Sequence, residues 1–72
     1  MASVTSEKKI EWKMLWEHGD LNNIIKENPG RGFTRYKVRK AIQVGEGHFE
    51  IMNAVTRFYN RRKKQQEKIS NQ

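Results

Sequence analysis

The sequence has no cysteine, one proline and two histidines among its 72 residues. Without cysteine, the chain has neither a disulfide nor a thiolate metal site. It also has no apolar run near the ~20 residues that a membrane-spanning helix needs. Residues 1–6 lack the apolar core of a signal peptide. We therefore expect no membrane attachment and an intracellular, cytoplasmic protein.

Side chains that carry out catalysis are scarce as well. His18 and His48 lie far apart and each neighbours a glycine, so their spacing fits no helix-based metal pair. The glycines at 30–32 and 45–47 lack the spacing of a nucleotide-binding loop and are typical of turns. A chain this short buries only roughly 60% of its unfolded surface, which leaves little room for a ligand pocket. We predict that the protein is not an enzyme, binds no metal and needs no cofactor.

Acidic residues are scarce in the second part of the chain. Residues 31–72 contain eleven Lys or Arg and three Asp or Glu, whereas residues 1–30 contain four and five. The whole chain has a formal net charge of +7. Such an asymmetry favours a polyanionic partner, above all nucleic acid, although a solvated basic surface is the simpler alternative.

The apolar residues that are present follow helical spacing. Residues 10–17 fit a helix or a strand, and we favour a helix capped by Ser6 because no partner strand is evident. Asp20 is a good cap for a second helix, which the sequence Asn28-Pro29-Gly30 ends. The apolar stripe of this second helix consists of Leu21, Ile24 and Ile25.

Two more helices follow in the basic part of the chain. Thr34 is a suitable cap for a third helix that runs to about Gln43, and a fourth begins at about His48. The third buries Val38, Ala41 and Ile42, and the stripe of the fourth is Ile51, Val55, Phe58 and Tyr59. The sequence predicts an all-α fold, a small bundle of three to four helices. We expect a flexible tail over residues 1–9, the domain over 10–64 and a frayed polar end over 65–72.

The exposed face of the third helix is basic and carries no acidic residue. At 100° per residue, the face opposite the apolar one carries Tyr36, Arg39, Lys40 and Gln43, with Arg35 beside it. Arginine pairs with guanine, and glutamine with adenine, in the major groove of DNA. An ordinary solvated helix usually mixes charges of both signs. The pattern therefore favours contact with nucleic acid.

This segment resembles the helix-turn-helix domains of Cro and repressor proteins, over residues 20–59. Gly32 matches the turn glycine, Phe33 the buried residue after it, and Thr34 the hydroxyl residue that opens the recognition helix. Asn28 stands where the family has an alanine, so the alignment needs a lengthened turn with Ile25 in the alanine's place. The resemblance implies that the third helix enters the major groove of double-stranded DNA. The residues it assigns to the groove are Thr34, Arg35, Tyr36, Arg39, Lys40 and Gln43.

A second basic run lies in the fourth helix. Arg57, Arg61 and Lys64 share one face at helical spacing. This basic run has two possible explanations. It is either a solvated C-terminal end without a partner, or a surface that contacts DNA phosphates. The candidate phosphate contacts are Arg31, Lys37, Arg57, Arg61, Arg62, Lys63 and Lys64.

Several functions are compatible with these faces. We favour sequence-specific binding of double-stranded DNA by a nucleoid-associated transcriptional regulator of a phage or mobile element. We also consider a homodimer on a palindromic DNA site, with Trp16 or the Phe58-Tyr59 region as its interface. For Trp12 and Trp16, however, packing in the core is the role that we expect. The alternatives are an RNA-binding or ribosome-associated protein, an architectural, excision or packaging DNA-binding factor, and an inhibitor that binds an acidic host protein.

Overall fold

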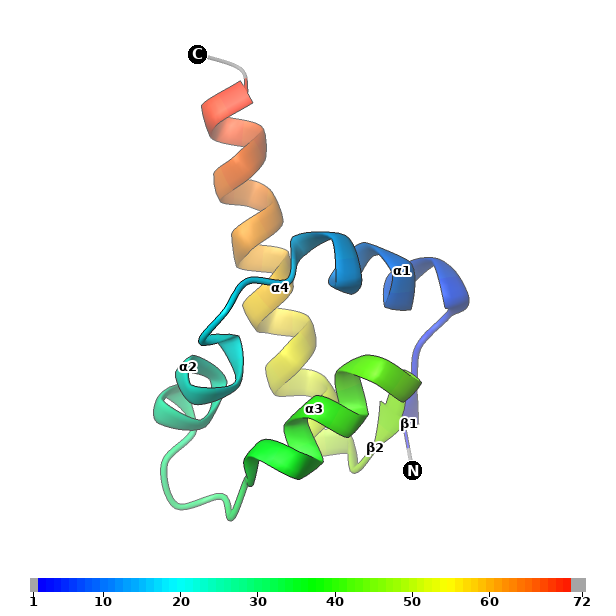
Figure 1. Cartoon of the computed structure of the whole chain (residues 1–72), viewed down its shortest axis with the longest axis vertical. Helices are drawn as coiled ribbons and strands as arrows, with labels where there is room; N and C mark the ends of the chain where they lie inside the picture. Colours follow the sequence, from blue (N-terminus) through cyan, green and yellow to red (C-terminus); the bar gives the residue numbers. More distant parts are fainter. Residues whose placement is uncertain (1, 71–72) are drawn as a thin grey trace.

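Four helices form the protein, and a computed structural model describes residues 2–70 (Figure 1). The helices are α1 (Ser6–Leu15), α2 (Asp20–Glu27), α3 (Arg35–Val44) and α4 (Phe49–Ser70). Two very short strands, β1 (Ala2–Ser3) and β2 (Glu46–Gly47), pair antiparallel with Ala2 opposite Gly47. The expected small all-α bundle is confirmed, with this strand pair as an addition that the sequence did not indicate.

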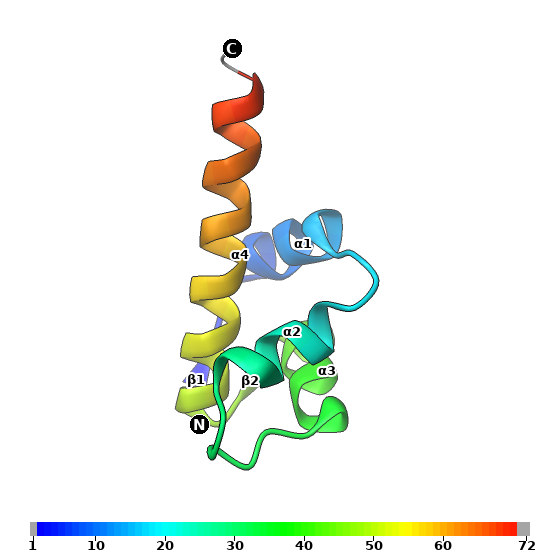
Figure 2. The same ribbon diagram turned by 90° about the vertical axis from the view of Figure 1, so that its left-hand side faces the viewer.

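The first three helices pack around the first half of α4. Trp12 and Leu15 of α1 are buried, as are Leu21 and Ile24 of α2. The predicted buried positions of α3 are at most 3% exposed. The stripe of α4 is buried too, and it also includes Met52 and Ala54. The second half of α4 projects beyond the other helices (Figures 1 and 2).

Local signals explain where the helices begin and end. The hydroxyls of Thr5 and Thr34 accept hydrogen bonds from the backbone amides three residues later and so cap α1 and α3. Gly45 ends α3 with a left-handed φ of 81°, a conformation that favours glycine. A Cβ at Gly45 would also lie 3.1 Å from the Lys9 side chain. Gly45 therefore ends α3 one residue after Val44, close to the end expected at about Gln43.

The ends of the chain differ from the sequence-based expectation. Residues 2–9 are not a loose tail, because β1 pairs with β2 and α1 begins at Ser6. Thr5 caps α1 in place of Ser6, and Gly19 precedes α2 in place of Asp20, which is the first residue of that helix. Residues 65–70 continue α4, while residues 71–72 lie outside the described part.

None of the helices described within residues 2–70 is both long enough and apolar enough to cross a membrane.

Candidate nucleic-acid interface

Helix α3 lies across the front of the bundle and exposes one side (Figure 1). Its residues Val38, Ala41 and Ile42 face the core, and the helix packs against α1, α2 and α4. The opposite face is open to solvent, and its residues are Tyr36, Arg39, Lys40 and Gln43, with Arg35 at its edge. The structure therefore brings together on one surface the side chains that the sequence assigned to the groove.

The cations of this face are not neutralised within the described residues. Arg35, Arg39 and Lys40 form no ion pair with any described carboxylate, and neither does Lys37 beside this face. Lys40 places its ammonium 6.0 Å from the centre of the Tyr36 ring, at the outer limit of a cation–π contact. Tyr36 itself is 64% exposed. The exposed face of α3 thus carries several cationic side chains and one exposed aromatic ring, that of Tyr36.

Thr34 has a different role from the other predicted groove residues. Its hydroxyl accepts a hydrogen bond from the Lys37 amide at 3.1 Å and caps the helix. The oxygen is exposed, and a hydroxyl can also donate its own hydrogen. Thr34 therefore holds the start of α3 and remains open to a further acceptor.

A loop over residues 28–34 joins α2 to α3. Gly30 and Gly32 adopt φ values of 76° and 72°, where a Cβ is strained. Phe33 is partly buried and packs against the core, so the end of the loop is anchored. Arg31, between the two glycines, points outward with 59% of its side chain exposed and lies 3.6 Å from Glu50.

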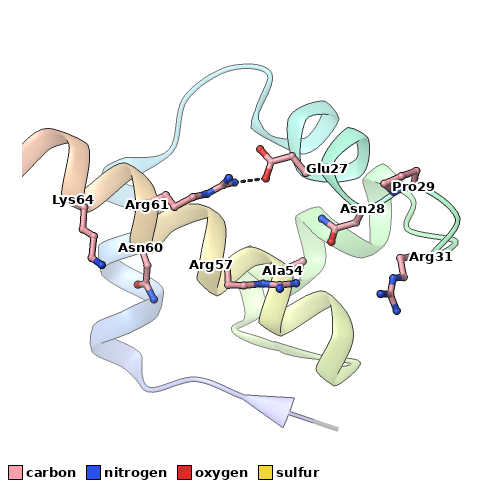
Figure 3. A pocket seen from close by; sticks show the side chains of 9 residues that line it. All are labelled: Glu27, Asn28, Pro29, Arg31, Ala54, Arg57, Asn60, Arg61 and Lys64. Atoms are coloured by element: carbon pink, nitrogen blue, oxygen red, sulfur yellow. Dashed lines mark hydrogen bonds and ion pairs between the residues drawn. The ribbon is translucent and has the colours of Figure 1, made fainter.

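A basic hollow lies between this loop and α4 (Figure 3). Its volume is about 610 Å³. Arg57, Asn60, Arg61 and Lys64 line it from α4, and Glu27 to Pro29 and Arg31 line it from the other side. Arg61 forms an ion pair with Glu27, whereas Arg57 and Lys64 have no carboxylate partner among residues 2–70. The hollow is therefore a second surface with an excess of positive charge.

Two of the predicted phosphate contacts pair with carboxylates of other helices, Arg62 in the interior and Lys63 at the surface. Arg62 donates from Nη1 to Asp20 Oδ2 at 2.6 Å and from Nη2 to Asp20 Oδ1 at 2.7 Å. It also donates to the Leu15 carbonyl, and its side chain is only 17% exposed. Lys63 lies 3.2 Å from Glu11 of α1. We therefore exclude Arg62 from the interface and assign Lys63 to the α1–α4 contact.

Asp20 is the residue whose role the sequence missed. It is 1% exposed, and it accepts hydrogen bonds from the Glu17 amide and the Tyr59 hydroxyl besides those from Arg62. Burial alone would raise the pKa of Asp20, but these hydrogen bonds outweigh burial and lower it. Burial and the neighbouring Asp20 charge raise the pKa of Tyr59. No local signal distinguishes this carboxylate from an ordinary helix-start aspartate, because its partners are distant in sequence.

The two tryptophans lie in different environments. Trp12 is 1% exposed and stacks on Tyr59, with the ring centres 5.9 Å apart. Trp16 is 40% exposed and lines a shallow hollow with Lys13 and three residues of α3, namely Arg39, Ile42 and Gln43. Core packing is thus confirmed for Trp12 and wrong for Trp16. The Phe58-Tyr59 region is buried in the core and is not available as a dimer surface.

Among the described residues, no three histidine, aspartate or glutamate side chains gather where they could hold a metal ion. His48 uses its Nδ1 to accept a hydrogen bond from the Glu50 amide at the start of α4, and His18 is exposed in the turn before α2.

No protein-family model, curated protein or solved structure matches this chain.

Proposed function

We propose that the protein binds double-stranded DNA with α3 in the major groove. The observation that carries this proposal is the exposed face of α3, which has cations, a tyrosine and a glutamine but no acidic residue. Arg39 has donors for the O6 and N7 acceptors of guanine, and Gln43 has both the donor and the acceptor that pair with N7 and N6 of adenine. Because the apolar side of α3 is fixed in the core, the basic side is held in one orientation, as groove contact requires.

Phosphate contacts would flank this helix. Lys37 at the start of α3 and Arg31 in the preceding loop are exposed on the same side of the connection. The backbone N–H groups at the N-terminus of α3 add a positive partial charge, which favours an anion such as a phosphate. Such contacts position the protein and raise its affinity without reading sequence.

The biological role that best fits is transcriptional regulation, in a phage or another mobile element. One domain of this size covers few base pairs, so a homodimer on a palindromic site stays part of the proposal. Trp16 lines the same hollow as Arg39 and Gln43. A dimer contact at Trp16 would therefore cover part of the groove-facing surface.

The experiment is selection of bound sequences from a random pool of DNA duplexes, with the purified full chain. We expect a recurring half-site. Structured RNA and single-stranded DNA compete in parallel at physiological salt. Preference for RNA, or equal recovery of all duplex sequences, would overturn sequence-specific DNA binding.

A further inference from the structure

The basic hollow of Figure 3 faces a different direction from the exposed side of α3. In Figure 2, α3 lies on one side of the molecule and the lower half of α4 on the other, and loop 28–34 crosses beneath them. No residue of α3 lines this hollow among those described. The exposed face of α3 and the hollow are therefore separate surfaces.

The hollow has the charge and the length to hold a nucleic-acid backbone. Four cations and one carboxylate line it, and Arg61 pairs with that carboxylate, Glu27. Arg31 pairs with Glu50, which lies outside the lining, so the two cations without a carboxylate partner among residues 2–70 are Arg57 and Lys64. Arg57, Arg61 and Lys64 form one row on α4, and the seven residue steps from Arg57 to Lys64 span about 10 Å of helix. About three consecutive phosphates of one DNA strand occupy the same axial length.

Arg31 connects the two surfaces. It lines the basic hollow together with Arg57 and also lines a second hollow, of about 480 Å³, together with Tyr36, Lys37 and Lys40. Its neighbours Gly30 and Gly32 turn the chain there with positive φ. Glu46 and Glu50 also line the second hollow, and Glu50 pairs with Arg31 at 3.6 Å. The two hollows therefore meet at Arg31, with an excess of cations on either side of this ion pair.

Because Arg31 lines both hollows, we propose that the basic hollow holds the sugar–phosphate backbone of the same duplex that α3 contacts, so that the DNA bends around the loop at Arg31. This inference rests on the proposed function. Bending brings additional phosphates onto the protein surface, and the added contacts compensate for the deformation. The protein then acts on DNA shape as well as on sequence.

The test compares two double variants of equal charge. Arg57→Gln with Lys64→Gln removes the two unpaired cations of the hollow, whereas Lys26→Gln with Lys63→Gln removes two charges from elsewhere on α2 and α4. Both are made in the full chain, and thermal unfolding confirms that each folds. Affinity is measured against salt concentration, and the bend is measured by energy transfer between dyes at the ends of a duplex of about 30 base pairs.

We expect the wild-type protein to shorten the distance between the ends of the duplex. The hollow variant should lose this shortening and reduce the slope of log K against log salt by about 2, while it keeps the wild-type sequence preference. The Lys26 and Lys63 variant should retain the bend.

Other results separate the two proposals. Sequence-specific binding with no bend, or a bend and slope unchanged in the hollow variant, overturns this inference and leaves the proposed function intact. Capture of a second labelled duplex through the hollow, without bending of the first, also overturns it. Absence of duplex binding by the wild-type protein overturns both.

Discussion

The guanidinium of Arg62 and the carboxylate of Asp20 form a two-point ion pair inside the protein. The two bonds measure 2.6 and 2.7 Å and join α4 to the first residue of α2. The Tyr59 hydroxyl donates a third bond to the same carboxylate at 3.0 Å, and the Arg62 guanidinium lies 4.8 Å from the centre of the Phe58 ring. This pair fixes the start of α2 against α4 and, through the loop after α2, the position of α3.

Asp20→Asn is expected to destabilise the fold strongly. The change leaves the Arg62 cation without its carboxylate in a site where only 17% of that side chain is exposed. Breaking a buried ion pair by removing one partner costs about 3–5 kcal/mol in free energy of unfolding. Urea denaturation followed by circular dichroism measures the change.

Glu17→Gln is the matched control. Glu17 contacts the Nε of the same arginine at 3.3 Å, but its side chain is 64% exposed. Exposed pairs contribute about 0–1 kcal/mol. Equal losses for Asp20→Asn and Glu17→Gln would contradict the importance of the buried pair.

Acid should weaken the fold through Asp20. The pKa of this carboxyl is lower in the folded protein than its ordinary value of 3.8. Its stabilisation is therefore fully present above that ordinary value and is lost as the pH falls through the lower folded pKa. Urea unfolding of the wild-type chain between pH 6 and pH 2 measures this loss.

Asp20→Asn should show a smaller fall in stability than the wild type over the same pH range, because the titrating group is absent. The other carboxylates remain in both proteins and contribute equally to both curves. Parallel curves for the two proteins would show that another group is responsible for the acid sensitivity.

Arg39→Ala and Lys37→Ala should affect DNA binding in different ways. Arg39 lies on the exposed face of α3, and loss of a base contact there should cost about 1–3 kcal/mol of discrimination at one base pair. Lys37→Ala should weaken binding to all sequences alike and reduce the slope of log K against log salt concentration by about 1. Titration of a selected site and its single-base variants distinguishes the two. A uniform loss from both variants argues against the assignment of Arg39 to a base.

Trp16 should report binding through its fluorescence. It is 40% exposed and lies beside Arg39 and Gln43, whereas Trp12 is buried in the core. A duplex on α3 is therefore expected to change the emission of Trp16 and to leave that of Trp12 unaltered. Trp16→Phe should remove the change while the protein still binds in a gel-shift assay. A full fluorescence change in this variant would mean that DNA alters the core around Trp12 instead.

The sequence predicted the helices well because their signals are local. Val38, Ala41 and Ile42 repeat at helical spacing and are buried as expected, and the caps and glycines that bound α3 lie within a few residues of the helix. The strand pair was not predicted, because β1 and β2 are two residues each and all of the first three helices lie between them in the chain.

Arg61, Arg62, Lys63 and Lys64 were indistinguishable in the sequence, where they form one basic run. In the helix they point in different directions and meet different neighbours. Arg62 turns inward to Asp20, Lys63 meets Glu11, and Lys64 reaches the basic hollow. Which charges remain available to a polyanion depends on neighbours from α1 and α2, and sequence spacing does not contain this information.

The sequence by itself determined the class of fold, the boundaries of α3 and the concentration of positive charge in residues 31–72. These follow from periodicity, capping and composition, which act over a few residues. Only the tertiary structure decided that Asp20 and Arg62 neutralise each other in the interior and that Arg31 joins two basic surfaces. The reason is physical: the net effect of a charge depends on its burial and on the charges around it, and packing sets both.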